Sequence, residues 1–268
     1  MKILQRMKDL KIIGQSVGHN KLTEKMLHFQ IEALINESEA LYLDHFYQQF
    51  DLIKQALRRR NHIFTNSLPD FSVPELKQLI SLAHEAGSVY QIFVPLVFQT
   101  ENLKQIKQIS GPFLANIRLP NNSEIDLENQ FLNFLLFLVL IDDSEFKKAD
   151  LMTIPGHEGY NLLEVRLVFT SGSVARILFS NQIGPKDSEI EIFRQKKPIL
   201  RFQAEDLSAS KAFESEQNAA EHFQKAVHHN ECISINLNHM HQARYILNDI
   251  KSKLNYSGNF FPEKRYAV

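Results

Sequence analysis

The chain has 268 residues and a formal net charge of −1, and apolar residues make up 44% of it. A chain of this length and apolar content builds one large domain or two small ones around a substantial core. A net charge near zero gives no long-range field of one sign, so we expect no nucleic-acid partner. The longest apolar run, Phe134–Ile141, is far shorter than the roughly 20 residues that a membrane helix needs. We therefore expect no membrane partner.

The numbers and spacing of cysteine and histidine residues indicate the redox compartment of the protein and whether it can bind a metal. The single cysteine, Cys232, excludes an intramolecular disulfide and is typical of a reducing compartment. Residues 1–11 carry charges every few positions and no apolar stretch of signal-peptide length, so we expect a cytoplasmic protein. The closest histidine groups are His228–His229 and His239–His241. Neighbouring helix positions point about 100° apart, so we expect no metal site.

Short apolar runs alternate with helical patterns in the first third of the chain. The expected strands are Lys11–Val17, Ala40–Leu43, Asn61–Thr65 and Val89–Val94. The expected helices are Leu22–Phe29, Phe50–Arg59 and a third that begins at a Ser72–Glu75 capping box and ends at Gly87. Strands that alternate with helices of this length predict a parallel sheet with βαβ crossovers.

The pattern changes after Pro95. The next expected elements are a helix at Leu103–Ile109, a strand at Phe113–Leu119 and a buried helix at Asp126–Ile141. Alternating strands follow, separated by turn signals: Leu162–Thr170, Ser173–Ser180, Glu189–Arg194 and Pro198–Phe202. This series predicts an antiparallel meander with one solvated or partner-facing side. Helices at Ala212–Val227 and His239–Leu254 close the chain.

The segment Ala56–Phe64 begins a recognisable order of motifs. Pro69, Glu75 and Leu82–Gly87 continue it, and later matches are Glu164–Gly172, Ala175–Ser180, Phe223–Val227 and Ile233–Ile235. Over roughly residues 10–256 the chain resembles the glucose-fructose oxidoreductase/inositol dehydrogenase (Gfo/Idh/MocA) family. The resemblance implies an α/β protein with a truncated Rossmann-like parallel sheet in 1–94. An α+β domain with a largely antiparallel, open-faced sheet, which often makes dimers, would follow in 95–268.

The resemblance also implies an NAD(P)-dependent oxidoreductase of sugars or polyols, with a glycine-rich loop after the first strand. The glycines of such a loop let the backbone approach the pyrophosphate. Gly14 and Gly18 are the only candidates, and their spacing is wrong. The alignment makes Lys11–Val17 the family's second strand, so the first strand and its loop would be absent. Ordinary loop glycines are the simpler interpretation.

The second expected cofactor stretch is the loop after Leu43. The family tends to have Thr-Pro there and a histidine a few residues on, whereas this chain has Asp44 and His45. Asp44 would place a negative charge close to the phosphates or the ribose, which opposes binding. Both residues are weak cofactor-binding candidates, and a polar loop is the alternative interpretation.

The catalytic positions implied by the resemblance carry other residue types. The family's Glu-Lys-Pro motif corresponds to Ser67-Leu68-Pro69, or to Asn66-Ser67-Leu68 if no insertion is allowed, and neither register contains a lysine. Leu68 has no charge and no proton to offer. The family's Asp-x-x-x-His-x-x-Asp helix corresponds to Asp126, Gln130 and Asn133. An amide does not titrate near neutral pH, so the proton transfer of the family's histidine would be lost. We interpret these four positions as vestigial and expect no catalytic residue.

Three functions remain open. The first is a homologue that has lost dinucleotide binding and catalysis, needs no cofactor, and acts in binding or assembly as a homo-oligomer through the open sheet. The second is an active NAD(P)-dependent oxidoreductase of a sugar or polyol that uses Asp126 and His45. The third is an unrelated α/β binding module. The first hypothesis also predicts that Lys11–Val17 lies directly beside Leu41–Leu43, because an empty slot in the sheet would leave backbone groups unpaired.

A run of cations remains outside these hypotheses. Arg58, Arg59 and Arg60 follow one another at the end of the second expected helix. Cations there offset the helix dipole. A phosphate-binding patch is the alternative interpretation.

Overall fold

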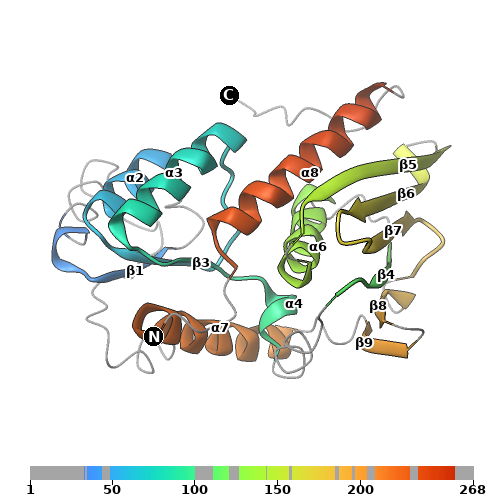
Figure 1. Ribbon diagram of the computed structural model, residues 1–268. Coiled ribbons are helices and arrows are strands. Elements are labelled where there is room, and N and C mark those ends of the chain that lie inside the picture. Colours follow the sequence, from blue (N-terminus) through green and yellow to red (C-terminus); the bar gives the residue numbers. More distant parts are fainter. Residues whose placement is uncertain are drawn as a thin grey trace, which may run out of the picture. The chain divides into compact units, whose positions relative to one another are not determined.

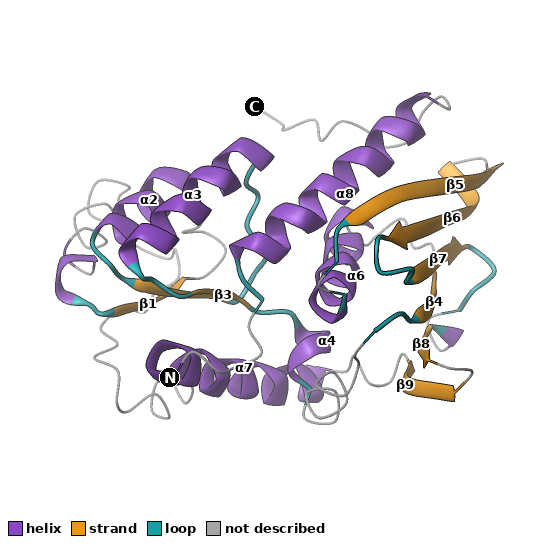
Figure 2. Ribbon diagram, viewed as in Figure 1, coloured by secondary structure: helices purple, strands orange, loops and turns teal. Residues whose placement is uncertain are grey.

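A computed structural model defines the fold of two units of the chain. It describes residues 33, 35–43, 49–99, 111–120, 127–142, 144–156, 159–184, 187–194, 197–203, 209–229 and 235–256. The first unit comprises Met1–Thr100 with Ala212–His241, and the second comprises Glu101–Lys211 with Gln242–Val268 (Figures 1 and 2). The expected elements Lys11–Val17, Leu22–Phe29 and Leu103–Ile109 lie outside the described residues, and so does the expected pairing of Lys11–Val17.

A parallel sheet forms the centre of the first unit. Its strands are β1 (Ala40–Leu43), β2 (His62–Thr65) and β3 (Tyr90–Ile92), in that spatial order. The crossovers are α2 (Phe50–Arg58) and α3 (Val73–Ala86). Ile53, Leu57, Leu76 and Leu79 of these helices are fully buried. The predicted βαβ architecture is confirmed.

Local sequence signals set the ends of α3. The Ser72 side chain accepts a hydrogen bond from the Glu75 amide, and the Glu75 carboxylate accepts one from the Ser72 amide. This capping box satisfies amides that would otherwise lack partners in the first helical turn. Gly87 ends the helix with φ of 65°, a left-handed conformation that glycine adopts without strain. The predicted start and end of this helix are confirmed.

A helix from the far end of the chain covers the other face of the parallel sheet. This helix, α7 (Ala209–His229), lies opposite α2 and α3 in Figure 1. Tyr42 donates its hydroxyl proton to Glu216 over 2.5 Å, and Gln91 donates to the Ala219 carbonyl over 2.7 Å. The Phe64 and Phe223 rings lie 5.6 Å apart. The sequence analysis assigned the segment of α7 to the predicted second domain, 95–268, because of its place in the chain. These contacts instead join α7 to the parallel sheet of the first unit.

Two further segments complete the first unit. The short helix α4 (Pro95–Phe98), which the sequence pattern did not predict, follows β3. Its Phe98 carbonyl accepts a hydrogen bond from Asn218 of α7 over 2.9 Å. The Ile235 carbonyl accepts a hydrogen bond from the Ile92 amide over 2.7 Å, so β3 has a backbone partner from the closing segment.

The second unit contains a six-stranded mixed sheet in the order β5-β6-β7-β4-β8-β9. Its strands are β4 (Leu114–Pro120), β5 (Phe146–Gly156), β6 (Gly159–Phe169), β7 (Val174–Ser180), β8 (Glu189–Arg194) and β9 (Lys197–Gln203). Only the β4–β7 pair is parallel, so the largely antiparallel sheet is confirmed.

The predicted meander needs one correction. β4 lies between β7 and β8, so these two strands are not neighbours as a continuous meander requires. β5 was not predicted at all. Its exposed positions alternate with half-buried ones, and it carries Lys147, Lys148 and Asp150, so its apolar alternation is weak. Strand order depends on pairing between distant segments, which alternation within one segment does not encode.

Helix α6 (Leu127–Ile141) covers one face of this sheet. Its Phe131 ring stacks on Phe179 at 5.3 Å, and its Phe137 ring meets the Phe202 ring edge-on at 6.2 Å. The inward positions of the sheet, such as Val165 and Ile177, are fully buried. The outward positions alternate with them and stay exposed or half-exposed, so the predicted open face is confirmed.

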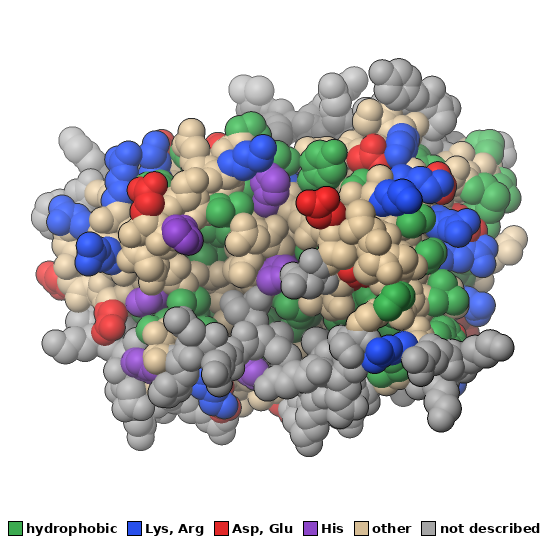
Figure 3. Space-filling view, in the orientation of Figure 1, with side chains coloured by type: hydrophobic (Ala, Val, Ile, Leu, Met, Phe, Trp, Pro, Cys, Tyr) green, Lys and Arg blue, Asp and Glu red, His purple; other side chains and the backbone are tan. Residues whose placement is uncertain are grey.

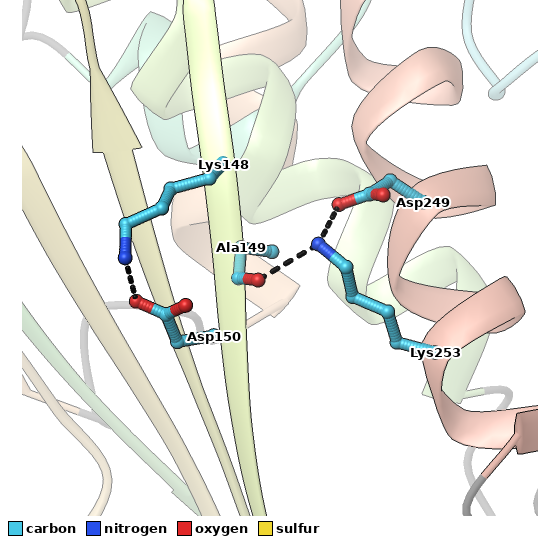
Figure 4. A network of polar contacts seen from close by, with 5 residues as sticks. All are labelled: Lys148, Ala149, Asp150, Asp249 and Lys253. Atoms are coloured by element: carbon cyan, nitrogen blue, oxygen red, sulfur yellow. Dashed lines mark hydrogen bonds and ion pairs between the residues drawn. The ribbon is translucent and has the colours of Figure 1, made fainter.

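Helix α8 (Leu237–Tyr256) lies along the edge strand β5 (Figure 4). Lys253 donates to the Ala149 carbonyl over 2.8 Å and to the Asp249 carboxylate over 2.6 Å. Lys148 pairs with Asp150 on the strand itself over 2.8 Å. A helix and charged side chains at a sheet edge oppose pairing with a foreign strand. No helix among the described residues combines the length and the apolar character that a membrane span requires.

Candidate functional site

The loop after β2, in the first unit, carries one set of candidate residues. Parallel α/β sheets bind ligands beyond the carboxyl ends of their strands, and this loop leaves β2 at that edge. The buried Thr65 hydroxyl donates to the Ser67 carbonyl over 2.8 Å and accepts from the Ser67 amide over 3.3 Å. The Asn66 amide donates to the Leu43 carbonyl of β1 over 3.3 Å. The loop is therefore held against both strands.

The chemistry that this loop offers is neutral. Leu68 is half-buried and Pro69 is buried, and neither side chain can donate or accept a proton. The Asn66 Oδ1 atom is buried and has no hydrogen-bond partner among the described residues. Between residues 66 and 69 the loop therefore presents an amide and a hydroxyl, and no group there titrates near neutral pH. Such a loop can orient a ligand but cannot exchange a proton with it.

The first turns of α6, in the second unit, carry a separate set of candidate residues. Gln130 and Asn133 are both half-buried and lie three residues apart, so they share one face of the helix. The Asn133 amide donates to the Asn129 carbonyl of its own helix over 2.9 Å. Neither amide titrates near neutral pH, so this face offers hydrogen bonds without acid–base chemistry.

The carboxylate nearest to these amides in sequence is held by cations. Glu128 accepts a hydrogen bond from Arg244 over 2.9 Å and pairs with Lys251 over 2.6 Å. Arg244 is only 8% exposed, so loss of Glu128 would leave a buried guanidinium without its carboxylate. Both cations come from α8. Glu128 therefore joins α6 to α8, and sequence spacing gave no sign of this role.

The predicted site residues are thus distributed as follows. Leu68 lies in the loop after β2 of the first unit, and Gln130 and Asn133 lie on α6 of the second unit, in the elements that the resemblance implied. The remaining candidates lie outside the described residues: Gly14, Gly18, Asp44, His45 and Asp126.

One histidine of the described residues, His62, has a clear structural role. No group of three or more His, Cys, Asp or Glu side chains in the described ranges could hold a metal ion. The His62 Nδ1 atom accepts a hydrogen bond from the Val89 amide over 3.0 Å, so the neutral ring carries its proton on Nε2. Burial lowers the pKa of His62, with Glu39 opposing and His228 adding to that effect. His62 therefore favours the neutral form and ties β2 to the segment before β3.

A buried carboxylate lies at the end of α6. Asp142, 5% exposed, accepts hydrogen bonds from the Ser144 amide over 3.0 Å and the Ser171 hydroxyl over 2.7 Å. The Ser173 hydroxyl accepts from the Phe113 amide over 3.1 Å and contacts Ser171. Burial raises the pKa of Asp142, but the hydrogen bonds from the serines outweigh it and leave the pKa lowered. The cluster fastens the β6–β7 hairpin to α6 and β4, which sequence analysis missed.

The fold of both units is that of the Gfo/Idh/MocA dehydrogenases, as solved structures show. Myo-inositol dehydrogenase from Lactobacillus casei, solved with NAD(H) and myo-inositol, has 12% sequence identity and a TM-score of 0.66, with 88% of this chain and 82% of that one covered. UDP-N-acetylglucosamine 3-dehydrogenase GnnA from Acidithiobacillus ferrooxidans has 15% sequence identity and a TM-score of 0.64, with 84% of this chain and 80% of that one covered. An oxidoreductase from Sinorhizobium meliloti has 12% sequence identity and a TM-score of 0.63, with 89% of this chain and 83% of that one covered. No family model and no curated protein sequence matches the chain.

Proposed function

We propose that this chain is a dehydrogenase-fold scaffold that has lost dinucleotide binding and catalysis and acts as a binding or assembly protein. The observation that carries the proposal is the chemistry of Leu68 and Gln130, which the resemblance aligns with the family's lysine and histidine. A general acid or base must titrate near the working pH, and neither side chain does. The neutral loop after β2 and the internally bonded Asn133 agree with this view.

The cofactor that the fold implies is NAD(P). The glycines that the resemblance assigns to its pyrophosphate, Gly14 and Gly18, lie outside the described residues. In the loop after β2, residues 66–69 contain no cation and no group that titrates near neutral pH. We derive no catalytic step through the cofactor from these residues.

The open face of the mixed sheet is the surface that we assign to assembly. Three of the four large apolar side chains exposed among the described residues lie on it: Leu114 at 44%, Met152 at 51% and Ile154 at 49%. Strand pairing places Leu114 beside Val174, which lies beside Val168. Leu114, Val174 and Val168 thus form a short apolar row on the open face, and exposed apolar patches often mark interaction surfaces.

Charges of both signs lie on the same face of the sheet. Arg176 of β7 makes a bidentate pair with Glu164 of β6, at 2.7 and 2.6 Å. Arg201 of β9 pairs with Glu189 of β8 over 2.7 Å. Arg118 of β4 has no ion pair among the described residues and lies opposite Glu189. A face that carries both signs can meet a second copy of itself about a two-fold axis, so we propose a homo-oligomer.

A thermal-shift titration tests the loss of cofactor binding. The melting temperature should not change with NAD, NADH, NADP or NADPH at millimolar concentration. A retained site would stabilise the folded chain by about 2.7 kcal/mol at a hundredfold excess over Kd. A clear, saturable rise in melting temperature with any of the four would contradict the proposal.

Light scattering coupled to size exclusion tests the assembly surface. The native chain should elute as an oligomer, and Leu114→Asp should shift it to the monomer, because it buries a carboxylate in the apolar row. Tyr245→Asp is the matched control, since Tyr245 is 57% exposed and lies on α8 rather than on the sheet. A native chain that is monomeric at high concentration would contradict assembly through this face.

The alternative function is an active NAD(P)-dependent oxidoreductase of a sugar or polyol. It is favoured by the fold that the chain shares with structures named as inositol and UDP-N-acetylglucosamine dehydrogenases. Asp126 and His45 would then carry proton transfer. Nicotinamide absorbance followed across a panel of sugars, nucleotide sugars and polyols separates the two functions, and sustained turnover with one of them would establish the alternative.

A further inference from the structure

The end of α2 has an uncommon residue in a strained position. The Asn61 amide donates to the Ala56 carbonyl over 3.1 Å, and the Arg60 amide donates to the Leu57 carbonyl over 2.9 Å. These two bonds define a Schellman motif, whose left-handed residue is usually glycine because a Cβ atom is strained there. In this chain the residue is Arg60, with φ of 64°, the one non-glycine residue with positive φ among those described.

Arg60 belongs to an exposed basic cluster, Arg58–Arg60. All three side chains are exposed, and none has an ion pair or side-chain hydrogen bond among the described residues. Lys54, one turn earlier on α2, lies 5.5 Å from the Phe50 ring centroid and extends the cationic side of the helix. Figure 3 shows Lys and Arg side chains over the part of the first unit where Figure 1 places α2 and α3.

The helix dipole does not account for the whole cluster. A cation in the last turn offsets the dipole, and Arg58 already supplies one. Arg60 lies beyond the last helical residue, in a conformation that opposes any side chain. A glycine would satisfy the backbone better at this position. The left-handed position of Arg60 therefore favours glycine, and the backbone alone gives no reason for an arginine there.

We propose that Arg58, Arg59 and Arg60 form a recognition site for a carboxylate-rich segment of a partner protein. A guanidinium group binds a carboxylate through two parallel hydrogen bonds, which an ammonium group cannot do. All three cations of the cluster are arginines. The cluster lies on a surface turn between α2 and β2, where an extended acidic segment can reach it from solvent.

The size of the cluster favours an acidic protein segment over other polyanions. Proteins that bind duplex DNA commonly neutralise about 6–10 phosphates, and the whole chain has a net charge of −1. Recruitment to anionic lipid takes about 4–8 clustered cations. Three guanidinium groups instead match two or three carboxylates of a short segment.

The test uses a variant whose fold should improve. Arg60→Gly removes one guanidinium group and relieves the strain, so a loss of binding cannot come from unfolding. The probe is a fluorescein-labelled peptide of alternating Glu and Asp, and binding is followed by fluorescence anisotropy at low salt. The native chain should bind the peptide, and Arg60→Gly should weaken binding about tenfold, the worth of one charge-assisted pair. Arg58→Gln with Arg59→Gln should abolish it.

Matched controls separate the site from general charge. Lys77→Gln with Lys225→Gln removes two exposed cations from α3 and α7 of the same unit and should leave binding unchanged. Arg60→Lys keeps the positive charge but loses the bidentate geometry of the guanidinium group. It should bind the peptide more tightly than Arg60→Gly and more weakly than the native chain. The proposal is overturned if the native chain does not bind the peptide, or if Arg60→Gly binds it equally well. Tighter binding to single-stranded DNA or to phosphatidylserine vesicles would overturn the assignment of the partner.

Discussion

Replacing Arg60 by glycine should make the folded chain more stable, although it removes a whole side chain. The left-handed conformation of Arg60, with φ of 64°, costs an L-residue roughly 1–2 kcal/mol. Glycine offsets part of this gain, because its extra freedom in the unfolded chain is worth about 0.4–1 kcal/mol. The Arg60 side chain is exposed, so little packing is lost. The expected net gain in the free energy of unfolding is about 1 kcal/mol.

Urea unfolding followed by far-ultraviolet circular dichroism measures this gain, because the chain has no tryptophan to report by fluorescence. The melting temperature should rise by roughly 3–5 °C for a domain of intermediate size. Arg58→Gly is the matched control: it removes the same side chain from the last helical residue, where glycine should cost about 0.5–1 kcal/mol. If Arg60→Gly destabilises the chain as much as Arg58→Gly does, the strain argument is wrong.

Three further predictions concern the core and the caps. Asp142→Ala should lower the free energy of unfolding by about 1–3 kcal/mol, because it leaves serine and backbone donors without their acceptor. The pKa of Asp142 is lowered in the folded chain. Its contribution to the free energy of unfolding is therefore present above the unfolded pKa and is lost as the pH falls through the folded pKa. The free energies of unfolding of the native chain and the variant, measured in urea, should converge in acid. Phe179→Ala should cost about 3–5 kcal/mol, whereas Leu178→Ala on the open face should cost far less, and equal losses would refute the assignment of faces. Ser72→Ala should cost about 1 kcal/mol in the same assay, and no loss would show that the capping box is dispensable.

The candidate site was partly accessible from sequence. Motif spacing placed Leu68 in the loop after β2 and Gln130 with Asn133 on one face of α6, and the structure has them there. Spacing could not show that the Asn133 amide bonds to its own helix. It also could not show that Arg244 and Lys251 hold Glu128. The contacts of Glu128 depend on α8, which is more than a hundred residues away along the chain.

Local signals in the sequence determined where several helices and strands begin and end. The Ser72–Glu75 box and Gly87 set both ends of α3, and apolar alternation identified β6 to β9 within a few residues. These signals act through neighbours within one turn or along one strand. A reader of the sequence alone can therefore evaluate them.

The tertiary structure alone decided which of these elements meet. It inserted β4 between β7 and β8, added β5 as an edge strand, and set α7 on the parallel sheet through Tyr42, Phe64 and Gln91. Each of these choices joins segments that are far apart in the chain. Their free energy comes from burial and hydrogen bonds between distant residues, and the pattern of one segment does not contain it.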